Sequence, residues 1–541
     1  MTLACFSMAN TAALTALRAA ARECQLVAPS FSDEQVAHGL AITDALRACF
    51  LPPAASAQGS SPLLQLPAEL LSDILSNLDA RDLACFTATC RSLCRDAPTL
   101  PPPPRQIGPV ETKLRLRAEA RGLDVGSSLP EGATSWVACL LKRDRRDAQM
   151  RQAPIAAGCQ NCIFVDKEGC LLTCGHDDIG FLLGHALDPD VNLWKTTIGS
   201  PTPVPSMQDR RVVSVATSNR HCLALSAEGE VYSWGSGDHG SLGHGDEGSR
   251  AVPCRVESLS QIERIATGSN CKSAAVDEKG RLFTWGSASF YTDEQDENGD
   301  ERPSGLGYEL DAETGYQASP RKVDAPSQER VVGVALGAGF TLAVTDAGAV
   351  FSFGFSRGGA LGHGSLESEV LPRQIEALAG ARRRFVAVAA GDCHALALTK
   401  EGELYGWGDD LANGHGRKER TPQRVAALIG QRVKLIAAKD YASCAVTETG
   451  ELFTWGASDA WGVGHEGPRD TPKRVEGLSG VEFAAVAMGA CHMLAADADG
   501  VVWAFGRRLA LGLGILSSAD NTTVPTPTPI PTLRVRILNS P

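Results

Sequence analysis

The sequence has 541 residues, of which 43% are hydrophobic and 21% are charged. This composition excludes a largely disordered chain and predicts a globular one that is too long for a single compact domain. The formal net charge of -12 argues against binding nucleic acid through the bulk field of the protein, and no apolar run approaches the ~20 residues of a membrane helix.

The 17 cysteines are scattered along the chain without a disulfide framework. The start of the sequence lacks the basic segment and apolar core that mark a secretory signal. Together these features predict reduced thiols and a cytoplasmic or nuclear protein. An organelle transit peptide is the alternative, because the start is rich in Ala, Ser and Thr, but Glu23 and the modest arginine content argue against it.

Residues 1–51 are expected to be a helical or flexible N-terminal region, with helices over 10–24 and 32–50. Residues 52–63 are expected to be a linker, because PPAASAQGSSP is typical of flexible or extended chain.

Residues 64–97 have the pattern of a short helical module. In LPAELLSDILSNLDARDLACFTATCRSLCRDA, which begins at Leu66, apolar side chains recur at helical spacing on one face. Pro67 stands near the first turn, where a helix tolerates proline. A plain helical packing segment would show the same leucine face, so the pattern alone leaves that alternative open.

This stretch resembles the F-box, a three-helix motif, in its Leu-Pro start, paired leucines, Ile-Leu step, Asp82-Leu83 pair and Cys90. The resemblance implies docking on the adaptor subunit of a cullin-type ubiquitin ligase. It also implies which residues bind the adaptor, although some would belong to the core of the module: Leu66, Pro67, Leu70, Leu71, Ile74, Leu75 and Leu83.

Residues 98–152 are expected to be a proline spacer followed by connecting helices. PTLPPPP at 98–104 favours extended polyproline conformation, and helical patches over 110–151 are expected to pack the F-box against the domain that follows. KRDRR at 142–146 is typical of a solvated helix face, with an acidic partner as the alternative.

Residues 153–538 consist of a unit repeated seven times at intervals of about 50–70 residues. Cys174-Gly175 marks the first unit, and an aromatic-glycine pair marks the others: Trp234-Gly235, Trp285-Gly286, Phe353-Gly354, Trp407-Gly408, Trp455-Gly456 and Phe505-Gly506. A Gly-rich turn and then Pro-x-x-Val or Ile follow each pair. Glycines such as Gly229 stand where a hairpin needs positive φ. The unit therefore predicts four short antiparallel strands, with the aromatic ring packed between adjacent sheets.

These landmarks resemble the repeat of the regulator of chromosome condensation family, over about Ala153 to Leu538. The resemblance implies an all-β seven-bladed propeller, here preceded by a small all-α F-box and a helical N-terminal region. The family's small-small-Gly-x-x-His signature is present at 389–394, and His221 and His492 fill the same histidine position. Other residues replace this histidine in four units: Asn161, Cys271, Phe340 and Ala442. A function that needed every histidine is therefore in doubt.

The ring is expected to close through a shared blade. Residues 154–175 look like a spare half-unit, while the last unit looks as if it lacks its second half. Pairing 154–175 with the C-terminal strands would remove both sheet edges.

Cysteines in the first unit have spacings that admit a zinc site: Cys159-x-x-Cys162 and Cys170-x-x-x-Cys174. In the repeat, however, Cys162 takes a small position and Cys174 takes the aromatic position, so buried thiols are expected. One histidine also recurs in the Gly-rich turn of five units: His185, His244, His363, His415 and His465. A ring of blades would hold these side chains too far apart to share a metal, so each is expected to make a structural hydrogen bond.

The third unit contains an acidic insertion at 287–305, SASFYTDEQDENGDERPSG. It matches a calcium-binding loop poorly, because Glu294 and Gly305 stand where Asp and a bidentate Glu are needed. A partner-binding loop is the preferred role, with an exposed polar loop as the alternative.

We find no nucleotide-binding loop, nucleophile motif or zinc-protease motif, so a non-catalytic protein without cofactor or metal is expected. The two resemblances predict a substrate-recognition subunit of a cullin-type ubiquitin ligase, with adaptor, cullin and an unidentified target protein as partners. The alternative is a guanine-nucleotide exchange factor or another propeller scaffold for a small GTPase. A light sensor similar to the plant ultraviolet-B photoreceptor is disfavoured, because the corresponding places read SNRH, GDCH and GACH without tryptophan.

Overall fold

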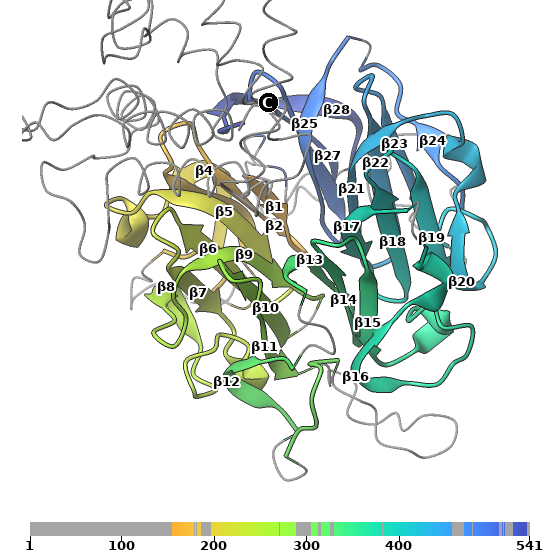
Figure 1. The fold of residues 1–541 in the computed structure, drawn as a ribbon. Coiled ribbons are helices and arrows are strands. Elements are labelled where there is room, and N and C mark those ends of the chain that lie inside the picture. Colours follow the sequence, from red (N-terminus) through yellow and green to blue (C-terminus); the bar gives the residue numbers. More distant parts are fainter. Residues whose placement is uncertain are drawn as a thin grey trace, which may run out of the picture. The chain divides into compact units, whose positions relative to one another are not determined.

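The described residues fold into seven four-stranded antiparallel sheets, which are the blades of a β-propeller (Figure 1). The computed structural model describes residues 154–537, apart from 178, 180, 186–195, 270, 288–304, 312–314, 325–328, 381–382, 410, 457–469, 479, 508–510, 512 and 514–522. The predicted all-β seven-bladed propeller is confirmed. Within these residues the structure contains no helix that is both long and apolar enough to span a bilayer.

Each blade takes its four strands consecutively from the chain. Blades 1 to 4 contain, in order, β1 (Ile155–Ala157), β2 (Asn161–Val165), β3 (Leu171–Asp177) and β4 (Thr196–Pro203); β5 (Val212–Thr217), β6 (His221–Ser226), β7 (Val231–Gly235) and β8 (Arg250–Arg255); β9 (Ile262–Thr267), β10 (Cys271–Asp277), β11 (Leu282–Ser287) and β12 (Gln317–Lys322); and β13 (Val331–Leu336), β14 (Phe340–Thr345), β15 (Val350–Gly354) and β16 (Glu369–Gln374).

Blades 5 to 7 contain β17 (Phe385–Ala390), β18 (His394–Thr399), β19 (Leu404–Gly408) and β20 (Glu419–Arg424); β21 (Val433–Lys439), β22 (Ala442–Thr447), β23 (Leu452–Gly456) and β24 (Lys473–Arg474); and β25 (Phe483–Met488), β26 (His492–Asp497), β27 (Val501–Arg507) and β28 (Thr523–Arg534). Short 3-10 turns lie in the connections at η2 (Pro205–Met207), η3 (Asp238–Gly240), η4 (Arg357–Gly359), η5 (Glu376–Leu378) and η6 (Ala426–Leu428).

The first strand of each blade is the innermost one. It packs against the first strand of the next blade all the way round the ring, as β13 does against β17 and β21 against β25. The second and third strands are almost fully buried; β6 and β14, for example, have no exposed residue. The small-residue runs in the sequence are therefore inner strands, whose side chains must fit close to the axis.

The aromatic-glycine pair ends the third strand, and its glycine allows the first turn of the blade to come close. Gly235 has a φ of +115°, and a Cβ at this position would lie 2.6 Å from the carbonyl oxygen of Arg220. Only glycine adopts this conformation without strain and leaves room for that carbonyl. The pair is therefore a structural feature of the repeat.

Each tryptophan of the pair is fully buried and reaches back to the preceding blade. Its indole N–H donates to a carbonyl in the Gly-rich turn of that blade, at Leu182 for Trp234 (2.9 Å), Ser241 for Trp285 (2.9 Å), Ala360 for Trp407 (2.7 Å) and Ala412 for Trp455 (2.7 Å). The predicted packing of the ring between sheets is confirmed, and the hydrogen bond adds a fixed orientation to it.

A separate hydrophobic cluster fills each of the seven junctions between blades. The core is thus distributed around the ring, and each blade depends on both of its neighbours for burial.

The predicted closure through a shared blade is wrong. Blade 1 is built entirely from 155–203 and blade 7 entirely from 483–534. The first hairpin pairs with β4, which carries the first Pro-x-x-Val landmark, so the sequence contains seven whole units and no spare half.

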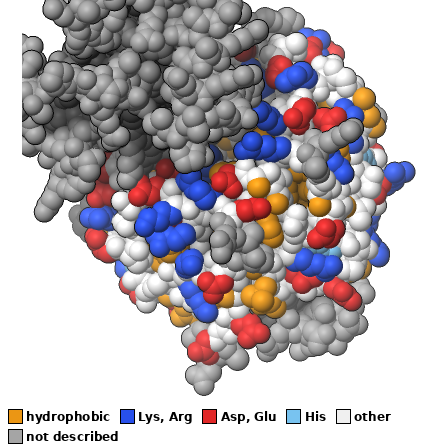
Figure 2. Space-filling view, viewed as in Figure 1, with side chains coloured by type: hydrophobic (Ala, Val, Ile, Leu, Met, Phe, Trp, Pro, Cys, Tyr) orange, Lys and Arg blue, Asp and Glu red, His pale blue; other side chains and the backbone are white. Residues whose placement is uncertain are grey.

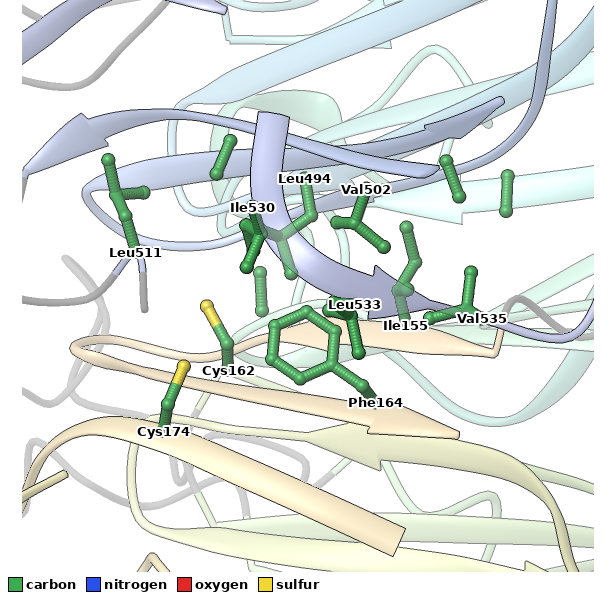
Figure 3. Packing of buried hydrophobic residues seen from close by; sticks show 14 residues of the cluster. Ile155, Cys162, Phe164, Cys174, Leu494, Val502, Leu511, Ile530, Leu533 and Val535 are labelled. Carbon is green, nitrogen blue, oxygen red and sulfur yellow. The ribbon is translucent and has the colours of Figure 1, made fainter. Parts of the chain in front are cut away.

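Blades 7 and 1 instead close the ring by packing face to face (Figure 3). Phe164, Cys162 and Cys174 of blade 1 meet Leu494, Val502 and Ile530 of blade 7 in one cluster. The end of the chain adds an isolated bridge between Asp166 and Val535, and Arg536 N donates to Val165 O at 3.2 Å. The two edges are therefore joined mainly by side chains, as at every other junction.

Replacing Trp407 with Phe keeps a ring in the junction but leaves the carbonyl of Ala360 without its donor. We expect the free energy of unfolding to fall by about 1–3 kcal/mol, because that carbonyl is buried. Trp503→Phe is the matched control, because the indole of Trp503 donates to the partly exposed carboxylate of Asp497 within blade 7. This variant should lose less than about 1 kcal/mol of the free energy of unfolding. Urea unfolding followed by far-UV circular dichroism measures both; equal losses would contradict the role of the interblade bond.

Candidate functional site

The turns between the first and second strands of the blades, here called the inner turns, surround the propeller axis at one end. They lie at this end together with the connections between the third and fourth strands, because the strands are antiparallel. We call this end the loop face. The longest connections in the propeller, including the segment from Ser287 to Gln317, reach it. The loop face is therefore the candidate site for recognition.

Backbone hydrogen bonds join inner turns of neighbouring blades. Asn219 N donates to Ser269 O at 3.2 Å, Asp392 N to Asp440 O at 2.7 Å, and Ala490 N to Gly158 O at 3.0 Å. These bonds cross three of the seven junctions and hold the inner turns together there.

A charged group at this rim comes from the end of β21, next to the inner turn of blade 6. Lys439 is 7% exposed, and burial lowers its pKa, while the nearby carboxylates of Asp440 and Asp392 act in the opposite sense. It also interacts electrostatically with Cys159 and Cys222 of blades 1 and 2, so its ammonium lies near the axis. Burial raises the pKa of Asp440, and Lys439 opposes that rise.

The two aspartates present buried oxygens to this group. Asp392 Oδ1 and Asp440 Oδ1 have no hydrogen-bond partner among the described residues. Asp440 also has a φ of +46°, a left-handed conformation that aspartate tolerates better than most residues. Buried charges without full hydrogen bonding are costly to keep, which marks the rim as a place where a partner could supply donors.

The described residues contain no group of three or more His, Cys, Asp or Glu side chains that could hold a metal ion. On the face seen in Figure 2, basic and acidic side chains are interspersed. Recognition there would depend on individual side chains, because mixed charges give no extended field of one sign.

The residues predicted to bind the adaptor lie outside the described residues: Leu66, Pro67, Leu70, Leu71, Ile74, Leu75 and Leu83. The same holds for residues 288–304 of the acidic insertion, so its predicted role stays a prediction. The ends of the insertion are described: Ser287 belongs to β11, and the carbonyl of Gly305 accepts from Thr341 Oγ1 at 2.6 Å.

The histidine position of the repeat is confirmed in three blades and corrected in one. His221, His394 and His492 are buried opposite the glycine of the aromatic-glycine pair. Their Nε2 atoms contact the next blade, at Ser273 (2.7 Å), Ser443 (2.7 Å) and Cys162 (3.1 Å). The signature histidine is thus an interblade contact, and its replacement in other blades affects packing first.

In blade 3 the residue at this position is Lys272, and the assignment to Cys271 is wrong. Lys272 is the residue that pairs with Gly286, because the inner turn of this blade is one residue longer. The side chain is fully buried, and Nζ donates to Phe340 O at 2.9 Å. Burial lowers the pKa of Lys272 to about 7.

The histidines of the Gly-rich turns make the predicted structural hydrogen bonds. His185, His244 and His363 contact the hydroxyls of Thr173 (3.1 Å), Ser233 (3.0 Å) and Ser352 (2.9 Å), and His415 contacts Gly406 O (3.2 Å). Each contact stays within one blade. His465 lies outside the described residues.

Two of the four cysteines of the first hairpin are buried as predicted, whereas Cys159 and Cys170 are partly exposed. Cys162 and Cys174 are fully buried and pair directly across β2 and β3. Cys174 takes the place that tryptophan holds in four other blades. Burial raises the pKa of Cys162 well above its usual value, as expected for a thiol in an apolar junction.

One sequence feature does indicate the charged group at the rim, although the repeat landmarks do not include it. Lys439-Asp440-Tyr441 stands where another unit has Gly391-Asp392-Cys393, so a charged residue replaces a small one beside the axis. Only the structure reveals that Asp392, from a different blade, is near enough to raise the pKa of Lys439.

Family models match both parts of the chain. The regulator of chromosome condensation (RCC1) repeat matches at 228–274, 347–398 and 449–496, and a second model of that repeat matches at 212–241, 385–417 and 433–460. An F-box-like model matches residues 63–97. The two resemblances read from the sequence are confirmed.

Known proteins are similar over the propeller. The ultraviolet-B receptor UVR8 of Arabidopsis thaliana is 31% identical over 258 residues, which are 47% of this chain and 52% of that protein. The human E3 ubiquitin-protein ligase HERC2 is 34% identical over 316 residues, which are 57% of this chain and 6% of that protein. The chain therefore spans about half of the first relative and a small part of the second.

Solved structures share the fold. Prp20p of Saccharomyces cerevisiae superposes with a TM-score of 0.55 at 22% identity, covering 71% of this chain and 89% of that one. Human WBSCR16 superposes with a TM-score of 0.53 at 19% identity, covering 66% and 93%. At identities this low, the structural likeness establishes the propeller fold alone.

The three buried signature histidines predict acid sensitivity. Burial lowers the pKa of His221 to about 3 and those of His394 and His492 to about 4. The unfolded chain binds these protons below pH ~6.5 while the folded chain does not, so stability falls as pH drops from about 6.5 towards 4, by up to roughly 1.4 kcal/mol per pH unit for each histidine. Urea unfolding of wild type and His394→Gln between pH 7.5 and 5 tests this: the free energy of unfolding of the variant should depend less steeply on pH, and an unchanged slope would refute it.

The buried Lys272 predicts that the stability of the propeller depends on pH in the alkaline range. Its folded pKa lies below that of the unfolded chain, so the folded state is penalised at and below pH ~7 and relieved as pH rises towards 10. The gain in free energy of unfolding of Lys272→Met over wild type should be about 1–3 kcal/mol larger at pH 7.0 than at pH 9.5. Denaturant titrations at both values give the difference. Lys279→Met, at an exposed position, is the control and should show no such change.

Proposed function

We propose that this chain, which carries an F-box-like domain ahead of a seven-bladed propeller of regulator of chromosome condensation repeats, is the substrate-recognition subunit of a cullin-type ubiquitin ligase. The observation that carries the proposal is the combination itself. An F-box-like match at 63–97 supplies an adaptor-docking module, and the propeller supplies a large rigid surface in the same chain. The chain is then a non-catalytic subunit of the cytosol or nucleus, and transfer of ubiquitin belongs to the assembled complex.

In this proposal the leucine face of the F-box-like domain binds the adaptor. Leu66, Pro67, Leu70, Leu71, Ile74, Leu75 and Leu83 repeat at helical spacing and suit a helix-in-groove contact, in which an apolar face is buried against a partner. Residues near the centre of an interface contribute most of the binding energy, because the contacts around them exclude water.

The loop face of the propeller is the surface proposed for the target protein. The inner turns are fixed to one another by backbone bonds such as Asp392 N to Asp440 O, so the rim is preorganised. Around it lie charged side chains of both signs, including the Arg220–Asp238 ion pair at 2.7 Å. Exposed ion pairs of this kind add little stability and can exchange partners.

The second candidate is a scaffold or exchange factor for a small GTPase. It is favoured by the fold shared with Prp20p, whose structure was described together with its binding properties to Gsp1p and histones. The two proposals separate experimentally, because an exchange factor accelerates release of a fluorescent nucleotide from the GTPase and a substrate receptor does not.

Replacing Leu70 and Leu71 with Asp places two charges on the apolar face. We expect co-purification of the full chain with the ligase adaptor to fall at least tenfold, because each charge would be desolvated in the interface. Ubiquitin transfer to the chain itself, in a reaction reconstituted with adaptor, cullin and its catalytic partners, should fall in parallel. The thermal transition of the propeller should stay unchanged.

The matched control is Leu366→Asp with Leu371→Asp, two leucines of the propeller that are 51% and 61% exposed. This variant carries the same number of added charges and should retain adaptor binding. Undiminished adaptor capture by the Leu70 and Leu71 variant would refute the proposed docking.

A further inference from the structure

We propose that Cys159 and Cys491 are a disulfide-forming pair, a site of covalent modification across the junction where blade 7 meets blade 1. The pair lies on the loop face, in the inner turns of the first and the last blade. It goes beyond the proposed function, since it concerns the closure of the ring and not the docking of partners.

The inner turns bring the two residues together. Ala490 N donates to Gly158 O at 3.0 Å, and the two cysteines are the next residues along each turn. Their thiols also interact, since Cys159 lowers the pKa of Cys491. The residues stand about 330 positions apart in sequence, so their meeting depends entirely on the closed ring.

A similar contact, one residue further along the acceptor turn, occurs in another junction. Between blades 5 and 6, Asp392 N donates to Asp440 O at 2.7 Å, and the following residues, Cys393 and Tyr441, are also joined by a side-chain hydrogen bond. Cys393 thus has the position of Cys491 but faces a phenol. Among the described inner turns, two thiols face each other only at the junction of blades 7 and 1.

The surroundings favour reaction at Cys491. The hydrogen bond from Cys159 lowers the pKa of Cys491, burial opposes it, and the guanidinium of Arg507 lowers the pKa further. Arg507 is held close, because its backbone N donates to Cys491 O at 2.9 Å. In contrast, burial raises the pKa of Cys393 to about 11. The thiolate is the reactive form, so Cys491 is the better nucleophile of the two positions.

Hydrogen peroxide is a suitable oxidant, because Cys491 is 6% exposed and admits a small molecule more readily than a bulky disulfide. The Cys491 thiolate attacks one peroxide oxygen, the O–O bond breaks, and with one proton the other oxygen leaves as water. The resulting sulfenic acid is then attacked by the Cys159 sulfur, which forms the S–S bond and releases a second water. Two thiols lose two electrons and two protons, and one peroxide becomes two waters.

The expected consequence is a covalently closed ring. The disulfide would restrict the unfolded chain over a loop of about 330 residues, and long loops give the largest entropic effect. Oxidation should therefore raise the melting midpoint of the propeller by roughly 5 °C, and dithiothreitol should reverse the shift.

The test treats the purified full chain with hydrogen peroxide, blocks the remaining thiols, and maps tryptic peptides by mass spectrometry. We expect residues 152–167 cross-linked to residues 475–507, the peptides that hold Cys159 and Cys491. Because 152–167 also contains Cys162, the variant Cys159→Ser decides which thiol reacts. It should abolish both the cross-link and the shift in midpoint.

Cys393→Ser is the matched control and should keep the cross-link and the shift, since it removes the equivalent thiol of blade 5. Three outcomes would overturn the proposal: the same cross-link in Cys159→Ser, a disulfide between Cys162 and Cys174 instead, or oxidation of other thiols without this cross-link. The serine side chain is close in size to cysteine, and an unchanged circular dichroism spectrum would establish that the variants fold.

Discussion

The structure depends on the packing of each blade against the preceding one. Trp234, Trp285, Trp407 and Trp455 fill the junctions with their rings, and their indole N–H groups reach carbonyls in the preceding blade. An isolated four-stranded sheet of this size would expose both faces, so no blade can form its core alone. The hydrogen bond is present at four junctions, and Phe353, Phe505 and Cys174 take the place of the tryptophan in the other blades. Apolar packing is therefore the contact that all seven junctions share.

The junction between blades 7 and 1 has the same arrangement as the others but a different side chain at its centre. No strand is exchanged at any junction, and here Cys174 stands where four other blades have a tryptophan. Leu511 and Ile530 of blade 7 occupy part of the space around it (Figure 3). A smaller wedge at the one junction that joins the two ends of the propeller makes this the natural place for a further link. Cys159 and Cys491 lie at this junction, and their oxidation would add a covalent link between the two ends of the propeller.

Much of the fold could be predicted from the sequence because its landmarks are local. The aromatic-glycine pair, the hairpin glycine and the Pro-x-x-Val step each report backbone geometry within a few residues, and seven copies give the number of blades. Closure could not be predicted in the same way. The predicted shared blade assumes that residues 154–175 are a spare half-unit. In the structure, β4 and β28 are the fourth strands of two complete blades. The extra residue in the inner turn of blade 3, which puts Lys272 in the histidine position, was likewise hidden by a local pattern.

The candidate site was less predictable, because it consists of residues far apart in sequence. Lys439 and Asp392 belong to different blades, and Cys159 and Cys491 belong to the first and the last. The F-box-like domain is the opposite case: its leucine pattern is local, so the adaptor-docking proposal rests on sequence, while the loop face rests on structure.

Hydrogen exchange at the indole N–H groups tests the central claim most directly. In a chain labelled with ¹⁵N at tryptophan, single Trp→Phe variants assign the signals of Trp234, Trp285, Trp407 and Trp455. These four should exchange slowly and at similar rates, since opening any one junction requires loosening the ring. If one of them exchanged several hundred times faster than the others, the blades would not be held by a common set of interblade contacts.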